Sequence, residues 1–325
     1  MRKFSKPDID YDKPRTVKEA RAMNKFQAQE YRKIMLKTFD KMKISGKRRK
    51  VFEALLGKRP HKGNPRASNN EALMELRKNL IELVHGYQKQ NPDHRLFFVT
   101  MMSDEYRVDK TKPWLFLKKL KAKSYKLIDK ELCKKHGVLG GVGAIEPVFI
   151  PNPPDDREPV YAFHTHVLLW ADKDVDLKAM EESLAEATNW HCSPPLTALQ
   201  IKEITPKIGK PAWWAFYMLK PPIDALNMVE GKDGKLTTRK TTKGYRPDAR
   251  LRLFEGLSLF DLNELVFSVR DGSYVLRPAL KAMKAKWKLA HPDLSPVDIS
   301  EAVRMFKRLW KTSRANHKHA WRVVN

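Results

Sequence analysis

The apolar residues of this chain follow two periods, and the change between them predicts how the chain is organised. Residues 16–43 and 68–88 carry apolar side chains at the three- and four-residue spacing of helices. Ser68 is expected to cap the second helix, with Glu71 as the acidic partner of a capping box. From residue 96 onward, short runs of apolar, β-branched and aromatic residues replace this spacing, as is typical of buried strands.

The central part of the chain is expected to alternate between strands and helices. Strands are predicted at residues 96–102, 138–150, 161–170 and 197–204, and helices at residues 114–131, 174–188 and 211–220. This order, β-α-β-β-α-β followed by a helix, is the split βαβ order of ferredoxin-like proteins. The expected fold class is therefore α+β, with an antiparallel ferredoxin-like sheet that has two helices on one face and an open second face.

Four regions are expected along the chain. They are residues 1–92, a basic helical extension; residues 93–226, the sheet domain; residues 227–250, a basic flexible segment; and residues 251–325, a mixed and then helical region that could bind DNA or a partner. Within the third region, Asp233-Gly234 could turn a hairpin, but mobility is favoured. In the fourth, Asp298-Ile299-Ser300-Glu301 is expected to cap a helix.

The charge balance narrows the choice of partner. The chain has 64 Lys and Arg against 38 Asp and Glu, a formal net charge of +26. This surplus excludes an ordinary enzyme of small metabolites and favours a polyanion, bound through phosphate contacts and counterion release. Cys133 and Cys192 have neither disulfide-framework nor zinc-site spacing. Neither a signal peptide nor a membrane span is apparent, so we expect a cytoplasmic protein without a membrane partner.

Two histidines stand two residues apart in the run Phe163-His164-Thr165-His166-Val167-Leu168-Leu169. Side chains alternate along a strand, so His164 and His166 project from one face, close enough to hold one metal ion. If the loop around Asp155 closes a symmetric hairpin, Glu146 lies opposite His164 on the same face. Glu146 is therefore the expected third ligand. The alternative is a pair of packed or hydrogen-bonded histidines.

A tyrosine and a lysine follow on the helix predicted at residues 211–220. Tyr217 and Lys220 are three residues apart and are expected to share a face of this helix. A phenol needs a nearby metal or base to become a nucleophile, and Lys220 could offset charge that develops on an attacked phosphate. The alternative is a core tyrosine, with Lys220 capping the last carbonyls of the helix. In a basic chain with a metal site, the tyrosine predicts an enzyme that cuts a nucleic-acid strand and holds it covalently.

Three motifs in chain order carry a family resemblance. Phe97-Phe98-Val99-Thr100, the histidine run and Tyr217-Met218-Leu219-Lys220 resemble the HUH endonuclease superfamily, in particular the single-tyrosine rolling-circle replication initiator (Rep) proteins of plasmids and phages. The resemblance covers about residues 93–222 and implies an RRM-like catalytic core. It also implies Mg²⁺ or Mn²⁺ held by the positions of His164, His166 and Glu146.

The same resemblance implies the reaction and the partners. The position of Tyr217 attacks a DNA phosphodiester, with Lys220 assisting near the phosphate, and leaves a 5′-phosphotyrosine and a free 3′-hydroxyl that primes synthesis. The implied partners are single-stranded DNA, an origin hairpin or duplex DNA, and a host helicase and polymerase.

The chain departs from the family pattern at three positions. Thr165 lies where an apolar residue is usual, and Trp213 lies where some single-tyrosine initiators have a glutamate that activates water. Pro147, directly after Glu146, suggests an edge position or a bent strand.

The motifs do not separate a replication initiator from an HUH transposase or a conjugative relaxase. Two alternatives come from other classes: a non-catalytic RRM-like module for single-stranded nucleic acid, and a basic RNA-associated structural protein. A pure binding protein would bind without divalent ions and would form no covalent adduct.

Overall fold

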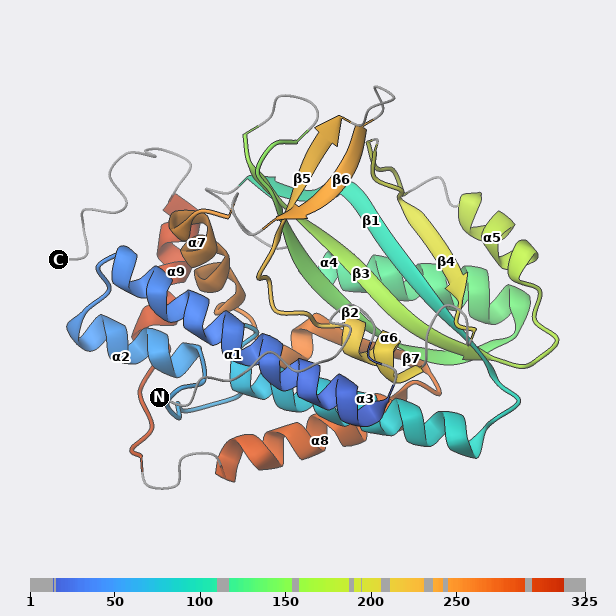
Figure 1. The fold of residues 1–325 in the computed structure, drawn as a ribbon, viewed down its shortest axis with the longest axis horizontal. Coiled ribbons are helices and arrows are strands. Elements are labelled where there is room, and N and C mark those ends of the chain that lie inside the picture. Colours follow the sequence, from blue (N-terminus) through green and yellow to red (C-terminus); the bar gives the residue numbers. More distant parts are fainter. Residues whose placement is uncertain are drawn as a thin grey trace.

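A curled, mixed β-sheet forms the centre of the protein, and helices lie against both of its faces (Figure 1). This computed structural model describes residue 14 and residues 16–109, 117–153, 158–186, 190–193, 195–205, 211–230, 236–241, 245–289 and 294–312. The protein is of mixed α+β class, as predicted. Within these ranges, none of the helices combines the length and the apolar composition that a membrane crossing requires.

The sheet has seven strands within the described ranges. They are β1 (Arg95–Asp109), β2 (Val138–Ile150), β3 (Val160–Ala171), β4 (Leu199–Glu203), β5 (Ala225–Glu230), β6 (Leu236–Thr241) and β7 (Val266–Arg270). Their order is β4-β1-β3-β2-β5-β6, and β7 also pairs with β2. Neighbours from β4 to β2 are antiparallel, whereas β5 meets β2 in parallel. The four predicted strands are present, and β5, β6 and β7 extend the sheet beyond them.

The helices account for most of the remaining described residues. They are α1 (Val17–Lys41), α2 (Gly46–Leu55), α3 (Asn70–Gln90), α4 (Leu117–Leu127), α5 (Leu177–Ala185), α6 (Pro211–Tyr217), α7 (Pro247–Leu257), α8 (Ser273–Leu289) and α9 (Ser300–Thr312). A π-helical segment, η1 (Ile128–Lys134), continues α4, and a 3-10 turn, η2 (Leu262–Leu265), precedes β7. Each predicted helix is present, although the predicted ends at residues 114 and 188 lie outside the described ranges.

The start of α3 differs from its prediction by one residue. Asn69 is the N-cap, because its Oδ1 accepts the Ala72 N–H at 2.9 Å. The hydroxyl of Ser68 is engaged elsewhere: it is buried and donates to the Leu55 carbonyl at 3.3 Å. The capping box predicted at Ser68 is therefore wrong, and Glu71 instead forms an ion pair with Arg32 at 2.9 Å.

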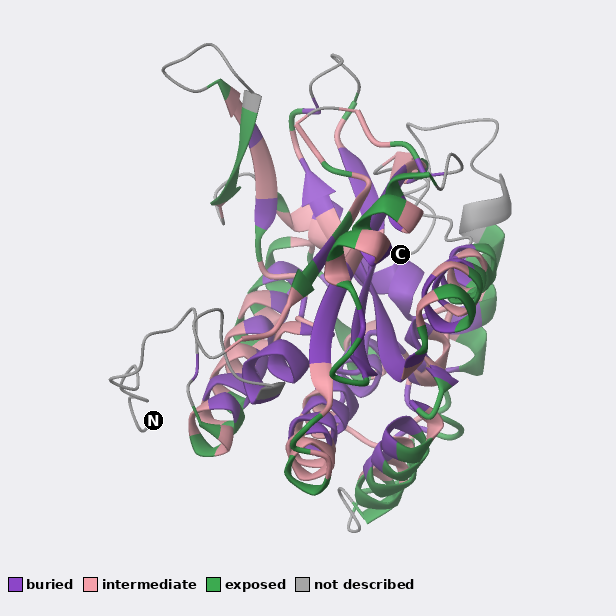
Figure 2. Cartoon of the chain, turned by 90° about the vertical axis from the view of Figure 1, so that its right-hand side faces the viewer, coloured by how far each residue is buried: buried purple, intermediate pink, exposed green. Residues whose placement is uncertain are grey.

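Different helices cover the two faces of β3. The Thr165 hydroxyl lies 2.9 Å from that of Ser124 on α4, and both residues are fully buried. On the opposite face, which also carries the histidines, Trp170 packs against Tyr87 of α3 with ring centroids 4.6 Å apart. This face was predicted to be open. It is covered at this end, where α3 packs on Trp170 and buries its large apolar ring. Figure 2 shows buried strands between helices whose outer surfaces are exposed.

Helices from both parts of the chain that flank the predicted sheet domain share its core. Helix α3 packs against α6 and α8, and β7 pairs with residues 140–144 of β2. One buried cluster has members from all four predicted regions, for example Leu76, Phe97, Ala249 and Phe267. The predicted boundaries at residues 92, 226 and 250 stay a prediction. The segment predicted to be flexible contains most of β5, all of β6 and the start of α7, and its flexibility stays a prediction.

Pro147 occupies a stretch of β2 that suits a proline. Strand β7 pairs with β2 as far as Ala144, and β5 pairs with it only at Phe149. Pro147 falls between these two partners and faces β3 on its other side, opposite Phe163. Because proline has no N–H to donate to a sheet ladder, it fits such an edge. Of the edge position and the bent strand that Pro147 suggested, the pairing of the described strands supports the edge position.

Candidate metal and tyrosine site

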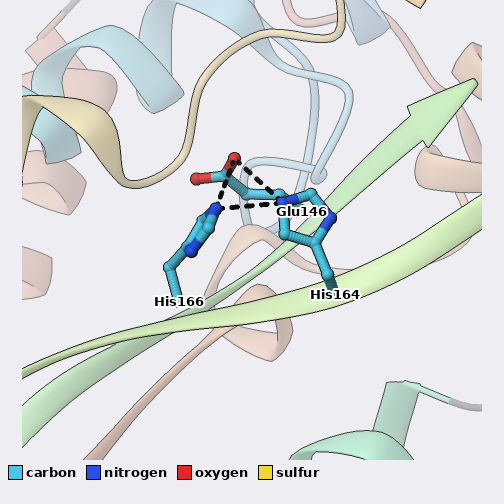
Figure 3. Close-up of side chains that lie close together, drawn as sticks. All are labelled: Glu146, His164 and His166. Carbon is cyan, nitrogen blue, oxygen red and sulfur yellow. Dashed lines mark hydrogen bonds and ion pairs between the residues drawn. The ribbon is translucent and has the colours of Figure 1, made fainter. Parts of the chain in front are cut away.

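Three possible metal ligands converge on the neighbouring strands β2 and β3 (Figure 3). The strands have the predicted symmetric register, with Glu146 opposite His164 and Ala144 opposite His166. His164 Nε2 and His166 Nε2 are 3.0 Å apart, and Glu146 Oε2 is 3.8 Å from each of them. The predicted residues therefore form a buried cluster that could hold a metal ion.

The spacing of the two imidazole nitrogens matches that of neighbouring ligands on one metal ion. The two imidazoles can share one hydrogen bond, but the carboxylate oxygen, at 3.8 Å, is too far from either nitrogen for another. Two neighbouring ligands of an octahedral ion, each about 2.1 Å from it, lie about 3.0 Å apart. The two nitrogens have this separation. A cation between the three side chains would be bound by two imidazole nitrogens and one carboxylate oxygen, which all lie within 4.8 Å of one another.

Burial sets the protonation states of the three side chains. It lowers the pKa of His164 to about 4 and the pKa of His166 well below its usual value, and the charges of Lys220 and Lys240 act in the same direction. Both imidazoles are therefore neutral at pH 7, which is the form that binds metals. Burial also raises the pKa of Glu146 to about 7, against the opposing charges of Lys220 and Arg77.

A threonine on β1 orients one of the histidines. Thr100 is paired with His166 across β1 and β3, and its Oγ1 lies 3.1 Å from His166 Nδ1. If Nδ1 carries the proton and donates it to Thr100, Nε2 is left with its lone pair toward the candidate metal position. Metal-binding histidines usually have such a partner on the other ring nitrogen. No role was predicted for Thr100, although a hydroxyl in an apolar strand was a visible signal.

Tyr217 lies beside the histidines at the end of α6. Its ring centroid is 5.3 Å from that of His166 and 5.8 Å from that of Phe98. Lys220 Nζ lies 3.0 Å from the centroid of the same ring. Burial, and then the charge of Glu146, raises the pKa of Tyr217. Its phenol therefore stays protonated at neutral pH unless added positive charge opposes these two effects.

The helix that carries Tyr217 ends three residues earlier than predicted. It stops at Tyr217 because Leu219 has φ of 58°, in the left-handed region that a residue with a side chain adopts at a cost of roughly 1–2 kcal/mol. This turn directs the Lys220 N–H toward Glu146 Oε1 at 3.4 Å. Tyr217 and Lys220 therefore meet through a strained turn and not on one helical face. The strain lies between Tyr217 and Glu146, a possible metal ligand, and backbone outliers of this kind often have a functional role.

Arg77 of α3 is a site residue that the sequence analysis missed. It is 1% exposed, and its Nη2 donates to the Phe216 carbonyl at 2.7 Å and to Gln27 Oε1 at 3.0 Å. Phe216 is in the last turn of α6, so the guanidinium caps a carbonyl that has no partner within the helix. Its charge also lowers the pKa of Glu146. A signal was present, since Arg77 falls within the apolar face of α3.

We expect Arg77→Met to destabilise the protein by about 2–4 kcal/mol, because a buried carbonyl loses its charged donor. Chemical denaturation measures this loss. The matched control is Arg21→Met, which removes an arginine whose side chain is 48% accessible and which pairs with the partly exposed Glu82. That change should cost less than about 1 kcal/mol. Equal losses in the two variants would contradict the role given to Arg77.

A pocket of about 540 Å³ joins the triad and the tyrosine to two strands that lie far apart in the sheet order. Its lining includes Tyr217, Lys220, Trp213, Trp214, Lys202 of β4 and Lys240 of β6. Neither Lys202 nor Lys240 was predicted to lie there. Lys240 is in the region expected to be flexible, so nothing in the local pattern brought it to the site.

Binding of Mn²⁺ is expected to weaken as the pH falls through about 7, the raised pKa of Glu146. Protonation of this carboxyl competes with the metal, whereas His164 stays neutral until its pKa of about 4 is approached. Below pH 7 the affinity should fall about tenfold per pH unit, because one proton is displaced for each ion bound. Titrations of Mn²⁺ followed by electron paramagnetic resonance measure this dependence. Glu146→Gln should bind more weakly and without the pH dependence; an unchanged dependence in that variant would exclude Glu146 as its source.

Comparison of the chain with protein-family models, with curated proteins and with solved structures gave no match.

Proposed function

We propose that this protein is a metal-dependent endonuclease and strand transferase, which nicks single-stranded DNA at a specific site to start rolling-circle replication. The observation that carries the proposal is the convergence of Glu146, His164 and His166 beside Tyr217 and Lys220 in one pocket. Each of these groups alone has an ordinary structural explanation. Together they supply a cation site, a nucleophile and a second positive charge within reach of one phosphate.

In the proposed reaction, the triad would hold Mg²⁺ or Mn²⁺, which polarises the scissile phosphate and favours the ionised phenol. Tyr217 Oη attacks the phosphorus, and its proton leaves to solvent. The bond between phosphorus and the 3′ oxygen breaks, and that oxygen takes a proton to become a free 3′-hydroxyl. The 5′ phosphate stays on Tyr217, so one phosphodiester is exchanged for another and the strand can be rejoined.

The other side chains have positioning and electrostatic roles in this proposal. Lys220, close to the Tyr217 ring, stabilises the phenolate and the charge that develops on the phosphate. Thr100 fixes the orientation of His166, and Arg77 holds the last turn of α6 in place. Arg77 and Thr100 touch no reacting atom in this scheme.

The chain topology supports a ferredoxin-like, RRM-like core. The order β1-α4-β2-β3-α5-β4 along the chain corresponds to the split βαβ motif. In this arrangement β1 and β3 are central strands, so the two histidines and Thr100 are on the most constrained part of the sheet. The net charge of +26 supports a DNA partner, with a host helicase and polymerase as further partners of the initiator role.

Covalent trapping tests the proposal. The protein is incubated with a pool of labelled single-stranded DNA that includes candidate origins, with Mn²⁺ or with EDTA, and is run on a denaturing gel. A labelled band at the combined mass of protein and DNA, absent with EDTA, is the expected result. Tight binding without an adduct would contradict the proposal and favour a non-catalytic module. Sequencing of the trapped strands would distinguish an initiator from a transposase or relaxase.

A further inference from the structure

The β5–β6 hairpin continues the sheet beside the site, where β5 pairs with β2 at Phe149. Its strands pair over six residues, from Ala225↔Thr241 to Glu230↔Leu236. Asn152, which follows β2, donates to the Met228 carbonyl at 2.7 Å and accepts the Met228 N–H at 3.2 Å. Met228 is buried in a small cluster with Ile150, Val160 and Ala162. Figure 1 shows the hairpin at the top of the sheet.

Alternate residues of β6 face the pocket. Thr238 and Lys240 line it, whereas Arg239, between them, does not. Lys240 is exposed, and its Nζ lies 5.9 Å from the centroid of the Tyr217 ring. In the described part of the chain, no carboxylate forms an ion pair with Lys240. Lys240 therefore places a positive charge close to Tyr217, and no described carboxylate neutralises it through an ion pair.

The side of the pocket formed by β4 has a similar exposed lysine. Gln200 and Lys202 of β4 line the pocket, and both are exposed. Strands β4 and β6 are at the two ends of the main strand order, with the triad on strands between them. Two carboxylates, those of Glu146 and Asp224, also line the pocket. The exposed lysines therefore lie on either side of the metal and tyrosine residues.

We propose that the β5–β6 hairpin forms one wall of a channel for single-stranded nucleic acid, in which Lys240 binds a backbone phosphate next to the one that Tyr217 attacks. This inference rests on the proposed function, which it deepens by naming where the strand lies. A pocket of about 540 Å³ has room for part of one strand and not for a duplex. The flexible side chain of a lysine can bind a backbone phosphate whatever the base sequence of the strand.

Salt-dependent binding tests the channel. Fluorescence anisotropy with a labelled oligothymidylate is measured in EDTA over a salt series for the wild-type chain, Lys240→Ala and Arg239→Ala. Loss of one phosphate contact lowers the slope of log affinity against log salt by about 0.7, which is about fivefold in affinity at 0.1 M salt. Lys240→Ala should show this loss. Arg239→Ala, with the same charge change on the other face of β6, should keep the wild-type slope, and Lys240→Arg should restore it.

Two further measurements separate failure of the channel from failure of the proposed function. Mn²⁺ titration without DNA should give the same affinity or a higher one in Lys240→Ala, because a repelling charge has been removed. Equal slope losses in Lys240→Ala and Arg239→Ala, or loss of Mn²⁺ binding in Lys240→Ala, would overturn the channel. If wild-type protein forms no covalent adduct but only Lys240→Ala loses slope, the channel stands and the nicking activity does not.

Discussion

Replacement of Tyr217 by phenylalanine is expected to abolish the covalent protein–DNA adduct while leaving Mn²⁺ binding and the fold intact. The ring of phenylalanine preserves the contacts with His166 and Phe98, so the variant removes little besides the phenolic oxygen. Loss of a nucleophile that has no substitute should reduce the rate of adduct formation by at least about 10⁴-fold. Rates are measured with labelled single-stranded DNA and saturating Mn²⁺.

Tyr274→Phe is the matched control for this prediction. Tyr274 is 75% exposed on α8 and does not line the pocket, so its hydroxyl should be dispensable. Wild-type rates in Tyr274→Phe, together with loss in Tyr217→Phe, would identify the nucleophile. An adduct that survives Tyr217→Phe would mean that another group attacks the phosphate.

Replacement of His166 by alanine is expected to lower the affinity for Mn²⁺ by more than about 100-fold. Loss of a hydrogen-bond partner behind a ligand typically costs 10–100-fold in metal affinity, and here the ligand itself is removed. When the Mn²⁺ concentration is 100 times the dissociation constant of the wild-type protein, bound Mn²⁺ should raise the free energy of unfolding by about 2.7 kcal/mol. His166→Ala should lose this gain, as thermal unfolding with and without Mn²⁺ measures.

The control for metal binding is a histidine outside the triad. His136 Nε2 forms a hydrogen bond with the Ser183 hydroxyl at 2.7 Å and is not part of the triad. His136→Ala should therefore keep the Mn²⁺-dependent stabilisation. His164→Ala provides a second triad variant, in case His166→Ala folds poorly. A full Mn²⁺ effect in both triad variants would contradict the metal site.

The hairpin that carries the triad could be predicted from the sequence because its register is a local property. A symmetric loop between two apolar runs fixes which residues face each other, and a shift by one residue would have turned Glu146 away from His164. The alternation of side chains then places both histidines on one face. These relations involve residues at most a few tens of positions apart, so pattern and turn geometry were sufficient.

The parts that could not be predicted depend on contacts between distant segments. Arg77 meets Phe216 across 139 positions, and no periodicity connects α3 with α6. Lys240 reaches the site because the hairpin is attached to the end of β2, where Asn152 and Met228 form two hydrogen bonds. The early end of α6 depends on the positive φ of Leu219, a conformation that leucine rarely adopts and that its sequence neighbours do not signal. The cover over Trp170 likewise comes from a helix that precedes the sheet in the chain.

The most direct test of the central claim is to locate the DNA on the protein. The adduct formed with Mn²⁺ is digested with nuclease and protease, and the modified peptide is sequenced by mass spectrometry. The proposed function predicts a 5′-linked nucleotide on Tyr217 in the peptide that contains Tyr217-Met218-Leu219-Lys220, with no modification when EDTA replaces Mn²⁺. A nucleotide on a different residue, or a modification that forms equally well in EDTA, would contradict it.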